Sequence, residues 1–110
     1  MSNLSIMVND QLAYEYDRST KLDEKQLAFL DKMDSDMDRG FRIHGELISK
    51  PDRKQKSAFV AMNLLKALKQ EDPAKIAVSC AYLVNRLPHA IELHAKDQDG
   101  RISIEFIDEH

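Results

Sequence analysis

Residues 91–106 read IELHAKDQDGRISIEF, and this stretch decides the fold class. Apolar side chains occupy alternate positions on both sides of Asp99-Gly100, first at Ile91, Leu93 and Ala95 and then at Ile102, Ile104 and Phe106. This alternation is typical of a strand that buries one face, and Asp-Gly is a preferred pair in two-residue hairpin turns. The sequence therefore predicts an antiparallel β-hairpin over residues 91–107.

A second alternating segment lies near the N-terminus. Leu4, Ile6 and Val8 alternate with Ser5 and Met7, and after Asn9-Asp10 the alternation continues at Leu12, Tyr14 and Tyr16. An isolated two-stranded hairpin is marginal in water. The C-terminal hairpin therefore needs cover from these residues or from helices, and we expect residues 1–20 to form a strand or an irregular segment.

Two helices are predicted, over residues 52–70 and 74–87. In both segments apolar residues recur every three or four positions, which is the spacing of one helix face. Pro51 and Pro73 suit the first helical position, where the missing N–H has no partner to lose. Pro88 ends the later helix, because the residue before a proline is displaced from the helical region. That helix is apolar around most of its circumference, so we expect it to be central.

Residues 22–48 show a further helical spacing. The apolar stripe consists of Leu27, Leu30, Met33, Met37, Phe41, His44 and Ile48. Gly40 and Gly45 each weaken a helix by about 1 kcal/mol relative to Ala. One straight helix and two shorter helices that meet near Gly40 both fit this pattern. His44 lies on the apolar side of the stripe, where we expect it to pack.

These elements together predict an α+β fold that is mainly α. Three to four amphipathic helices form a helical body over residues 22–87, and a small antiparallel sheet comes from the C-terminal hairpin and, as an option, from N-terminal strands. The chain has 110 residues, of which 43% are hydrophobic. This length suits one domain, which we take as residues 1–110.

The composition bounds the class of protein further. Charged residues make up 32% of the chain, there is one cysteine, and no apolar run approaches the length of a membrane span. A single cysteine excludes an internal disulfide and a zinc site built from several cysteines. The first ten residues lack the basic and apolar regions of a secretory signal, so we expect a cytoplasmic protein.

An aspartate-rich run contains Asp34, Asp36 and Asp38, followed by Gly40. Carboxylates at alternate positions resemble the opening of an EF-hand calcium loop. Arg39 stands where that loop needs its glycine, and Gly45 stands where it needs its bidentate glutamate. A weak calcium site at these three aspartates is therefore an alternative hypothesis, and the competing interpretation places them on the solvent side of a helix.

A basic cluster consists of Lys50, Arg53, Lys54 and Lys56. Cations at the start of a helix favour phosphate groups, which makes this cluster the candidate partner-binding site and motivates a nucleic-acid hypothesis. The whole chain has a net charge of −3, which weakens that hypothesis. The competing interpretation is that the cluster complements the acidic run, within one chain or between two.

No motif nominates a catalytic centre or a cofactor. The three glycines are too dispersed for a phosphate-binding loop, and His44, His89, His94 and His110 show no ligand spacing. Cys80 falls on the apolar stripe of its helix, where a thiol acts as a small hydrophobe.

We therefore expect a small non-catalytic interaction or regulatory protein that binds no cofactor and no membrane. Five methionines suit adaptable contacts, and a small domain gains buried area by forming a homodimer. Nucleic-acid binding and calcium binding are the two alternatives.

Overall fold

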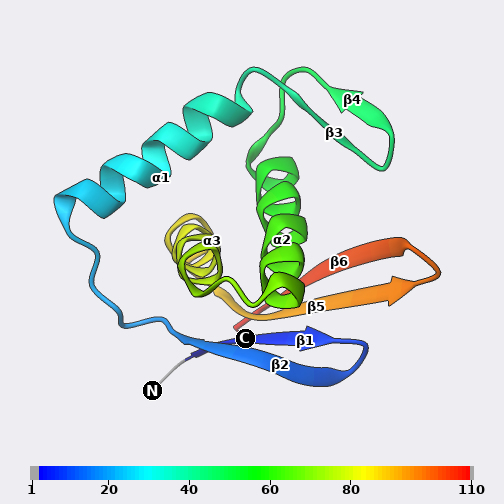
Figure 1. The fold of residues 1–110 in the computed structure, drawn as a ribbon. Helices are drawn as coiled ribbons and strands as arrows, with labels where there is room; N and C mark the ends of the chain where they lie inside the picture. Colours follow the sequence, from blue (N-terminus) through cyan, green and yellow to red (C-terminus); the bar gives the residue numbers. More distant parts are fainter. Residues whose placement is uncertain (1–2, 110) are drawn as a thin grey trace.

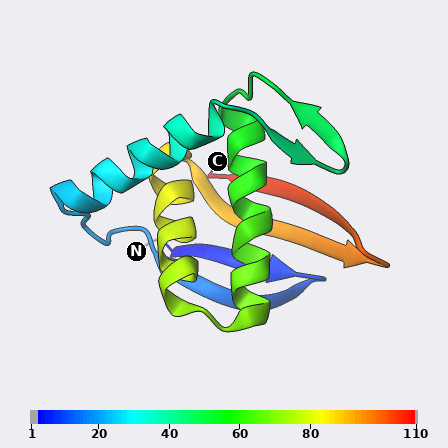
Figure 2. The same cartoon turned by 45° about the horizontal axis from the view of Figure 1, so that its top comes forward.

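The computed structural model describes residues 3–109 and shows helices packed on one face of a β-sheet (Figure 1). The helices are α1 (Glu24–Met37), α2 (Arg53–Gln70) and α3 (Pro73–Arg86). The strands are β1 (Asn3–Val8), β2 (Gln11–Asp17), β3 (Phe41–Ile43), β4 (Glu46–Ile48), β5 (Ala90–Gln98) and β6 (Arg101–Asp108). A four-stranded sheet has the order β2-β1-β5-β6, and α2 and α3 lie side by side over one of its faces (Figure 2).

The expectation of a mainly α fold is wrong. The structure contains 43% helix and 34% strand, so it is a balanced α+β fold. Two features account for the difference. The N-terminal hairpin joins the C-terminal one through a parallel β1–β5 pair, which makes the sheet mixed instead of purely antiparallel. A separate two-stranded sheet, β3–β4, also interrupts the expected helical body.

Both hairpins of the main sheet turn on two residues in the left-handed region. Asn9 and Asp10 have φ of 50° and 67°, and Asp99 and Gly100 have φ of 54° and 81°. Positive φ at both positions is the signature of a type I′ turn, whose twist matches that of the flanking strands. The predicted hairpin over residues 91–107 is thus confirmed, and its strands run from Ala90 to Asp108.

The two predicted helices in the second half of the chain are confirmed as α2 and α3. Helix α2 begins at Arg53, and not at Pro51, because Asp52 caps it. The Asp52 carboxylate accepts from the Gln55 amide at 2.8 Å, and the Gln55 side chain accepts from the Asp52 amide at 2.9 Å. Such a reciprocal capping box satisfies two donors that would otherwise lack partners.

The apolar stripe over residues 22–48 does not form a continuous helix. Helix α1 ends at Met37, and Gly40 follows with φ of 94°, where an added Cβ would lie 2.8 Å from the Ile48 carbonyl oxygen. The chain then forms the β3–β4 hairpin, and Phe41 stacks on Phe59 of α2 at 4.3 Å between ring centroids. His44 sits exposed in the hairpin turn with φ of 52°, so its predicted packing on a helix is wrong.

The core lies between the sheet and helices α2 and α3. Its fully buried side chains include Leu4 and Ile6 of β1, Leu93 of β5, Leu64 of α2 and Leu83 of α3. The second half of α3 is central, as expected, because residues 79–83 are all buried, whereas its first turn is exposed. Among the residues that the structure describes, no helix is long and apolar enough to cross a membrane.

Candidate protein-binding groove

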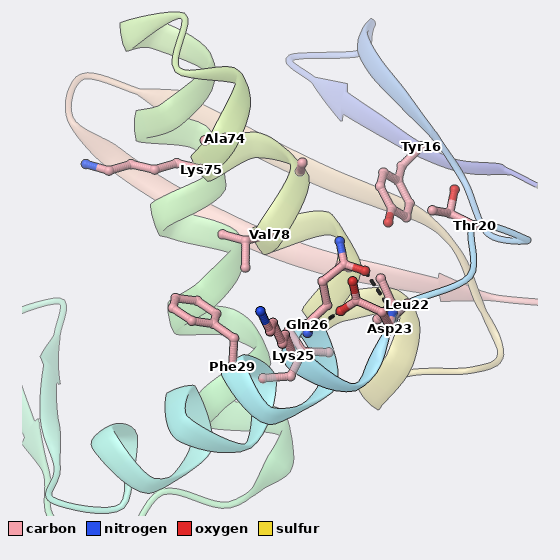
Figure 3. Close-up of a pocket in the computed structure, with 13 residues that line it drawn as sticks. Tyr16, Thr20, Leu22, Asp23, Lys25, Gln26, Phe29, Ala74, Lys75 and Val78 are labelled. Carbon is pink, nitrogen blue, oxygen red and sulfur yellow. Dashed lines mark hydrogen bonds between the residues drawn. The ribbon is translucent and has the colours of Figure 1, made fainter.

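An open groove lies between the first half of α1, the first half of α3 and the segment that follows β2 (Figure 3). Its volume is about 670 Å³. The lining is mainly apolar and includes Tyr16, Leu22, Phe29, Leu30, Ala77 and Val78. Two of its three sides are helical, and the third is the end of β2 with the segment that follows it.

The groove exists because α1 packs on the body only from Leu30 onward. Its buried residues are Leu30 and Met37, whereas residues 24–29 are all exposed. Phe29 keeps 50% of its surface exposed and Leu27 keeps 39%. The start of the helix is held by a local capping box of Asp23 and Gln26, which needs no contact with the body. The first half of α1 therefore leaves apolar surface of α1 and α3 open.

Lysines stand on the two helical walls of the groove. Lys25 comes from α1 and Lys75 from α3 (Figure 3). The Lys75 side chain is 69% exposed, and its ammonium lies 3.9 Å from the Asp72 carboxylate. Asp23, the acidic residue of the lining, is engaged as the cap of α1 and accepts from the Gln26 amide at 2.8 Å. An apolar floor thus has two lysines at its rim, of which Lys75 lies within ion-pair distance of Asp72 and extends away from Phe29 and Val78 (Figure 3).

A polar cluster fixes the second half of α1 to α3. The Asp34 carboxylate accepts from the Tyr82 hydroxyl at 2.5 Å and from Arg86 Nε at 2.9 Å. Arg86 Nη2 also lies 2.9 Å from both Asp34 and Asp31. We call Asp34, Tyr82 and Arg86 the α1–α3 clamp, since these three residues join the helices beside the groove.

The ionisation of the clamp follows from its geometry. Burial acts to raise the pKa of Asp34, but hydrogen bonds from Tyr82 and Arg86 and the charges of Arg86 and Lys56 outweigh it and lower the pKa. Burial, followed by the hydrogen bond to Asp34, raises the pKa of Tyr82. Asp34 therefore stays ionised and Tyr82 stays protonated at neutral pH, so the hydrogen bonds from Tyr82 and Arg86 to the Asp34 carboxylate are kept.

The three aspartates of the metal hypothesis lie at the end of α1, and each contacts a cationic side chain; Asp34 and Asp38 share the Lys56 ammonium. Asp34 belongs to the clamp, Asp36 pairs with Lys32 at 3.1 Å, and Asp38 pairs with Lys56 at 2.5 Å. The run is helical up to Met37, with Asp38 as the cap, so it forms no ligand loop. Within residues 3–109 there is no group of three or more His, Cys, Asp or Glu side chains placed to hold a metal.

The structure separates the four residues of the basic cluster. Lys50, Arg53 and Lys54 are exposed near the start of α2. The Lys56 side chain is only 14% exposed, and its ammonium lies 2.5 Å from Asp38 and 3.9 Å from Asp34. Lys56 thus joins α2 to the end of α1, and three cations remain on the surface.

The histidines and the cysteine do not form a catalytic pair among the described residues. His94 Nε2 lies 2.6 Å from Glu92 on β5, and His89 is exposed after α3. His110 lies outside the described residues. Cys80 is buried, and burial raises the pKa of its thiol to about 12, so no thiolate nucleophile forms at neutral pH.

No protein-family model, curated protein or solved structure matches the chain. The candidate site therefore stands on its geometry.

The groove was not found from the sequence. Phe29 and Val78 fall beside the apolar stripes of their helices, and an aromatic residue just off a stripe is the one signal that could have nominated this surface.

Proposed function

We propose that this chain is a small non-catalytic protein-interaction domain of the cytoplasm that binds a helical segment of a partner protein in the α1–α3 groove. The observation that carries the proposal is the open apolar groove beside Phe29, whose ring is half exposed although α1 is anchored at its other end. Exposed apolar surface of this kind costs free energy unless a ligand covers it.

The shape of the groove favours a helix as the ligand. Two helices form its walls, and an amphipathic helix laid between them would bury apolar residues at helical spacing against Phe29 and Val78. A small molecule usually has most of its surface buried by its pocket, whereas this groove is partly open to solvent.

The charges at the margin favour acidic residues flanking the apolar face of the partner. Lys25 and Lys75 stand on opposite walls, and the nearby Asp23 and Asp72 are engaged as the caps of α1 and α3. Opposite charges at the rim of an interface speed association and fix orientation. The ligand class is therefore an apolar helix with acidic flanks.

Nucleic-acid binding is less well supported. Lys56 is paired with Asp34 and Asp38, which leaves Lys50, Arg53 and Lys54 against a chain whose net charge is −3. Strong phosphate binding needs several free cations, because each contributes to affinity through release of counterions.

The proposal is tested by selecting peptides from a random displayed library against the wild-type domain. We expect the selected peptides to be amphipathic with acidic flanks, and to shift amide signals of α1 and α3 in ¹H–¹⁵N spectra. Ala77→Glu places a carboxylate in the groove on an exposed position and should remove binding. Asn63→Glu adds the same charge on an exposed position of α2 and serves as the matched control.

Peptides that bind wild type and Ala77→Glu equally well would contradict the proposal, and so would a selection that enriches no peptide. Enriched sequences that are basic in place of acidic would contradict the assigned role of Lys25 and Lys75.

A further inference from the structure

A second pocket lies beside the groove, between the segment that joins β2 to α1 and the second half of α3. Its volume is about 480 Å³, and Tyr16 and Thr20 line both hollows (Figure 3). The charged side chains of its lining are Arg18 and Lys21, and among the residues that the structure describes no carboxylate lines it. The whole chain has 19 acidic residues against 16 lysines and arginines, so cations alone in one pocket favour an anion as its ligand.

The Arg18 guanidinium is held in place but its charge is not compensated. Its Nη2 donates to the carbonyl oxygen of Pro88, which follows α3. Its Nε is buried and has no hydrogen-bond partner within residues 3–109, and no carboxylate in that range forms an ion pair with it. Asp17, its neighbour in sequence, accepts from the Ser19 amide at 2.8 Å and from the Ser19 hydroxyl at 2.6 Å. An anion in the pocket would therefore compensate a partly buried cation.

Two further groups of the pocket are donors. Lys21 is exposed and forms no ion pair in the described part of the chain. Asn85 accepts from Arg86 through Oδ1, so its amide Nδ2 keeps two N–H groups for a ligand. Asp31 and Asp34, which α1 brings to this end of α3, are both paired with Arg86. The pocket thus offers two cations and an amide donor to the same ligand.

The rest of the lining is largely apolar. It includes Leu27 of α1, which keeps 39% of its surface exposed, and Val84 of α3. An organic group attached to the anion gains free energy by covering these side chains. The ligand therefore combines an anionic head with an apolar body.

We propose that this pocket binds a phosphate monoester of an aromatic alcohol. Arg18 and Lys21 hold the phosphate group, with the Asn85 amide as a further donor, and the ring covers Leu27 and Val84. A phosphate monoester has a charge of about −1.5 to −2 at pH 7 and three acceptor oxygens, which match two cations and an amide. A carboxylate offers one charge and two oxygens. Arginine also suits phosphate because its planar guanidinium presents several donors in a fixed geometry.

Two sources supply such a group: a small phosphate ester and a phosphorylated tyrosine side chain of another protein. Both present an aryl phosphate, which is the chemistry that the pocket recognises. Phenyl phosphate and a short peptide of glycine and serine with one central phosphotyrosine distinguish the two sources.

This inference is independent of the groove. Arg18, Lys21 and Asn85 line the second pocket and do not line the groove. Failure of phosphate binding and failure of helical-peptide binding are therefore separate results.

The test is a ¹H–¹⁵N titration of the full chain with phenyl phosphate at low ionic strength. We expect saturable shifts at Arg18, Lys21 and Asn85. Arg18→Gln and Lys21→Gln each remove one cation and should raise the dissociation constant on the order of tenfold, as expected for a lost hydrogen bond between charged groups. Lys66→Gln makes the same charge change on an exposed position of α2 and should leave the dissociation constant unchanged.

Benzoate and inorganic phosphate should bind more weakly than phenyl phosphate, because the first has a single charge and the second has no ring. A phosphotyrosine peptide that binds as tightly as phenyl phosphate would assign the pocket to a phosphorylated protein, and one that does not bind would assign it to a small ester. The absence of shifts at millimolar phenyl phosphate would overturn the inference. Equal affinity for benzoate, or an unchanged dissociation constant in the exposed-site variant Lys21→Gln, would overturn it as well.

Discussion

Replacement of Asp34 by alanine tests whether the α1–α3 clamp holds helix α1. The carboxylate accepts from Tyr82 at 2.5 Å and from Arg86 at 2.9 Å. Tyr82 is 1% exposed and the Arg86 side chain 18% exposed, so neither donor can recover its bond fully from water. A hydrogen bond to a charged group contributes about 1.5–3 kcal/mol, and without Asp34 the partly buried Arg86 keeps only the exposed carboxylate of Asp31 as an ion-pair partner. We expect Asp34→Ala to lower the free energy of unfolding by about 2–4 kcal/mol.

Asp36→Ala is the matched control, because Asp36 lies two residues away on the same helix and pairs only with Lys32. That pair is exposed, with 70% and 56% of the two side chains accessible, so its loss should cost less than about 0.5 kcal/mol. Urea denaturation followed by circular dichroism at pH 7 measures both variants. Equal destabilisation by the two changes, or a cost below about 1 kcal/mol for Asp34→Ala, would refute the assigned role of the clamp.

Three further predictions concern the titration of Asp34, the core and the β3–β4 hairpin. The pKa of Asp34 is lowered in the folded chain. The contribution of the Asp34 carboxylate to folding stability is therefore fully present above the ordinary aspartate pKa of about 4 and is lost as the pH falls through the lower folded value. The stability advantage of wild type over Asp34→Asn should shrink on acidification, and an advantage that stays constant down to strongly acidic pH would contradict this. Leu83→Ala should cost about 2–5 kcal/mol in chemical denaturation, because Leu83 is 1% exposed in the centre of the core; a cost below about 1 kcal/mol would mean that α3 is misplaced. Gly40→Ala should lower the melting temperature more than Gly45→Ala, since both glycines have positive φ but only the Cβ added at Gly40 meets a backbone atom; equal shifts would count against the close approach at Gly40.

Local sequence signals were sufficient for the elements that they directly control. Asp99-Gly100 and the alternation around it gave the C-terminal hairpin, and apolar spacing with well-placed prolines gave α2 and α3. Each of these signals acts over a few residues, so no tertiary information was needed to interpret it.

The β3–β4 hairpin shows where spacing alone fails. Phe41 and Ile48 fit a helical stripe and also a pair of short strands. The outcome depends on Gly40 and Gly45, which adopt positive φ, and on Phe59 of α2, which stacks on Phe41. The stacking partner is not visible in a local pattern, so the helical interpretation of this segment was wrong.

The mixed sheet and the groove depend on contacts between distant parts of the chain. Ile6 pairs with Leu93 in the parallel β1–β5 ladder, and nothing in either strand specifies the other as its neighbour. The groove depends on how α1 crosses α3, which the contact of Asp34 with Arg86 helps to determine. Sequence analysis considered Asp34 for an alternative metal hypothesis and for pairing of the acidic run with the basic cluster, but it did not identify Arg86 as a partner, because Arg86 lies 52 residues away.

The central claim is that the α1–α3 groove is a protein-binding site, and the most direct test is a ¹H–¹⁵N titration with a selected acidic, amphipathic peptide. We expect saturable shifts that cluster on residues around Phe29 and Val78, that are absent in Ala77→Glu and that are retained in Asn63→Glu. Shifts that cluster elsewhere, or that persist unchanged in Ala77→Glu, would contradict it.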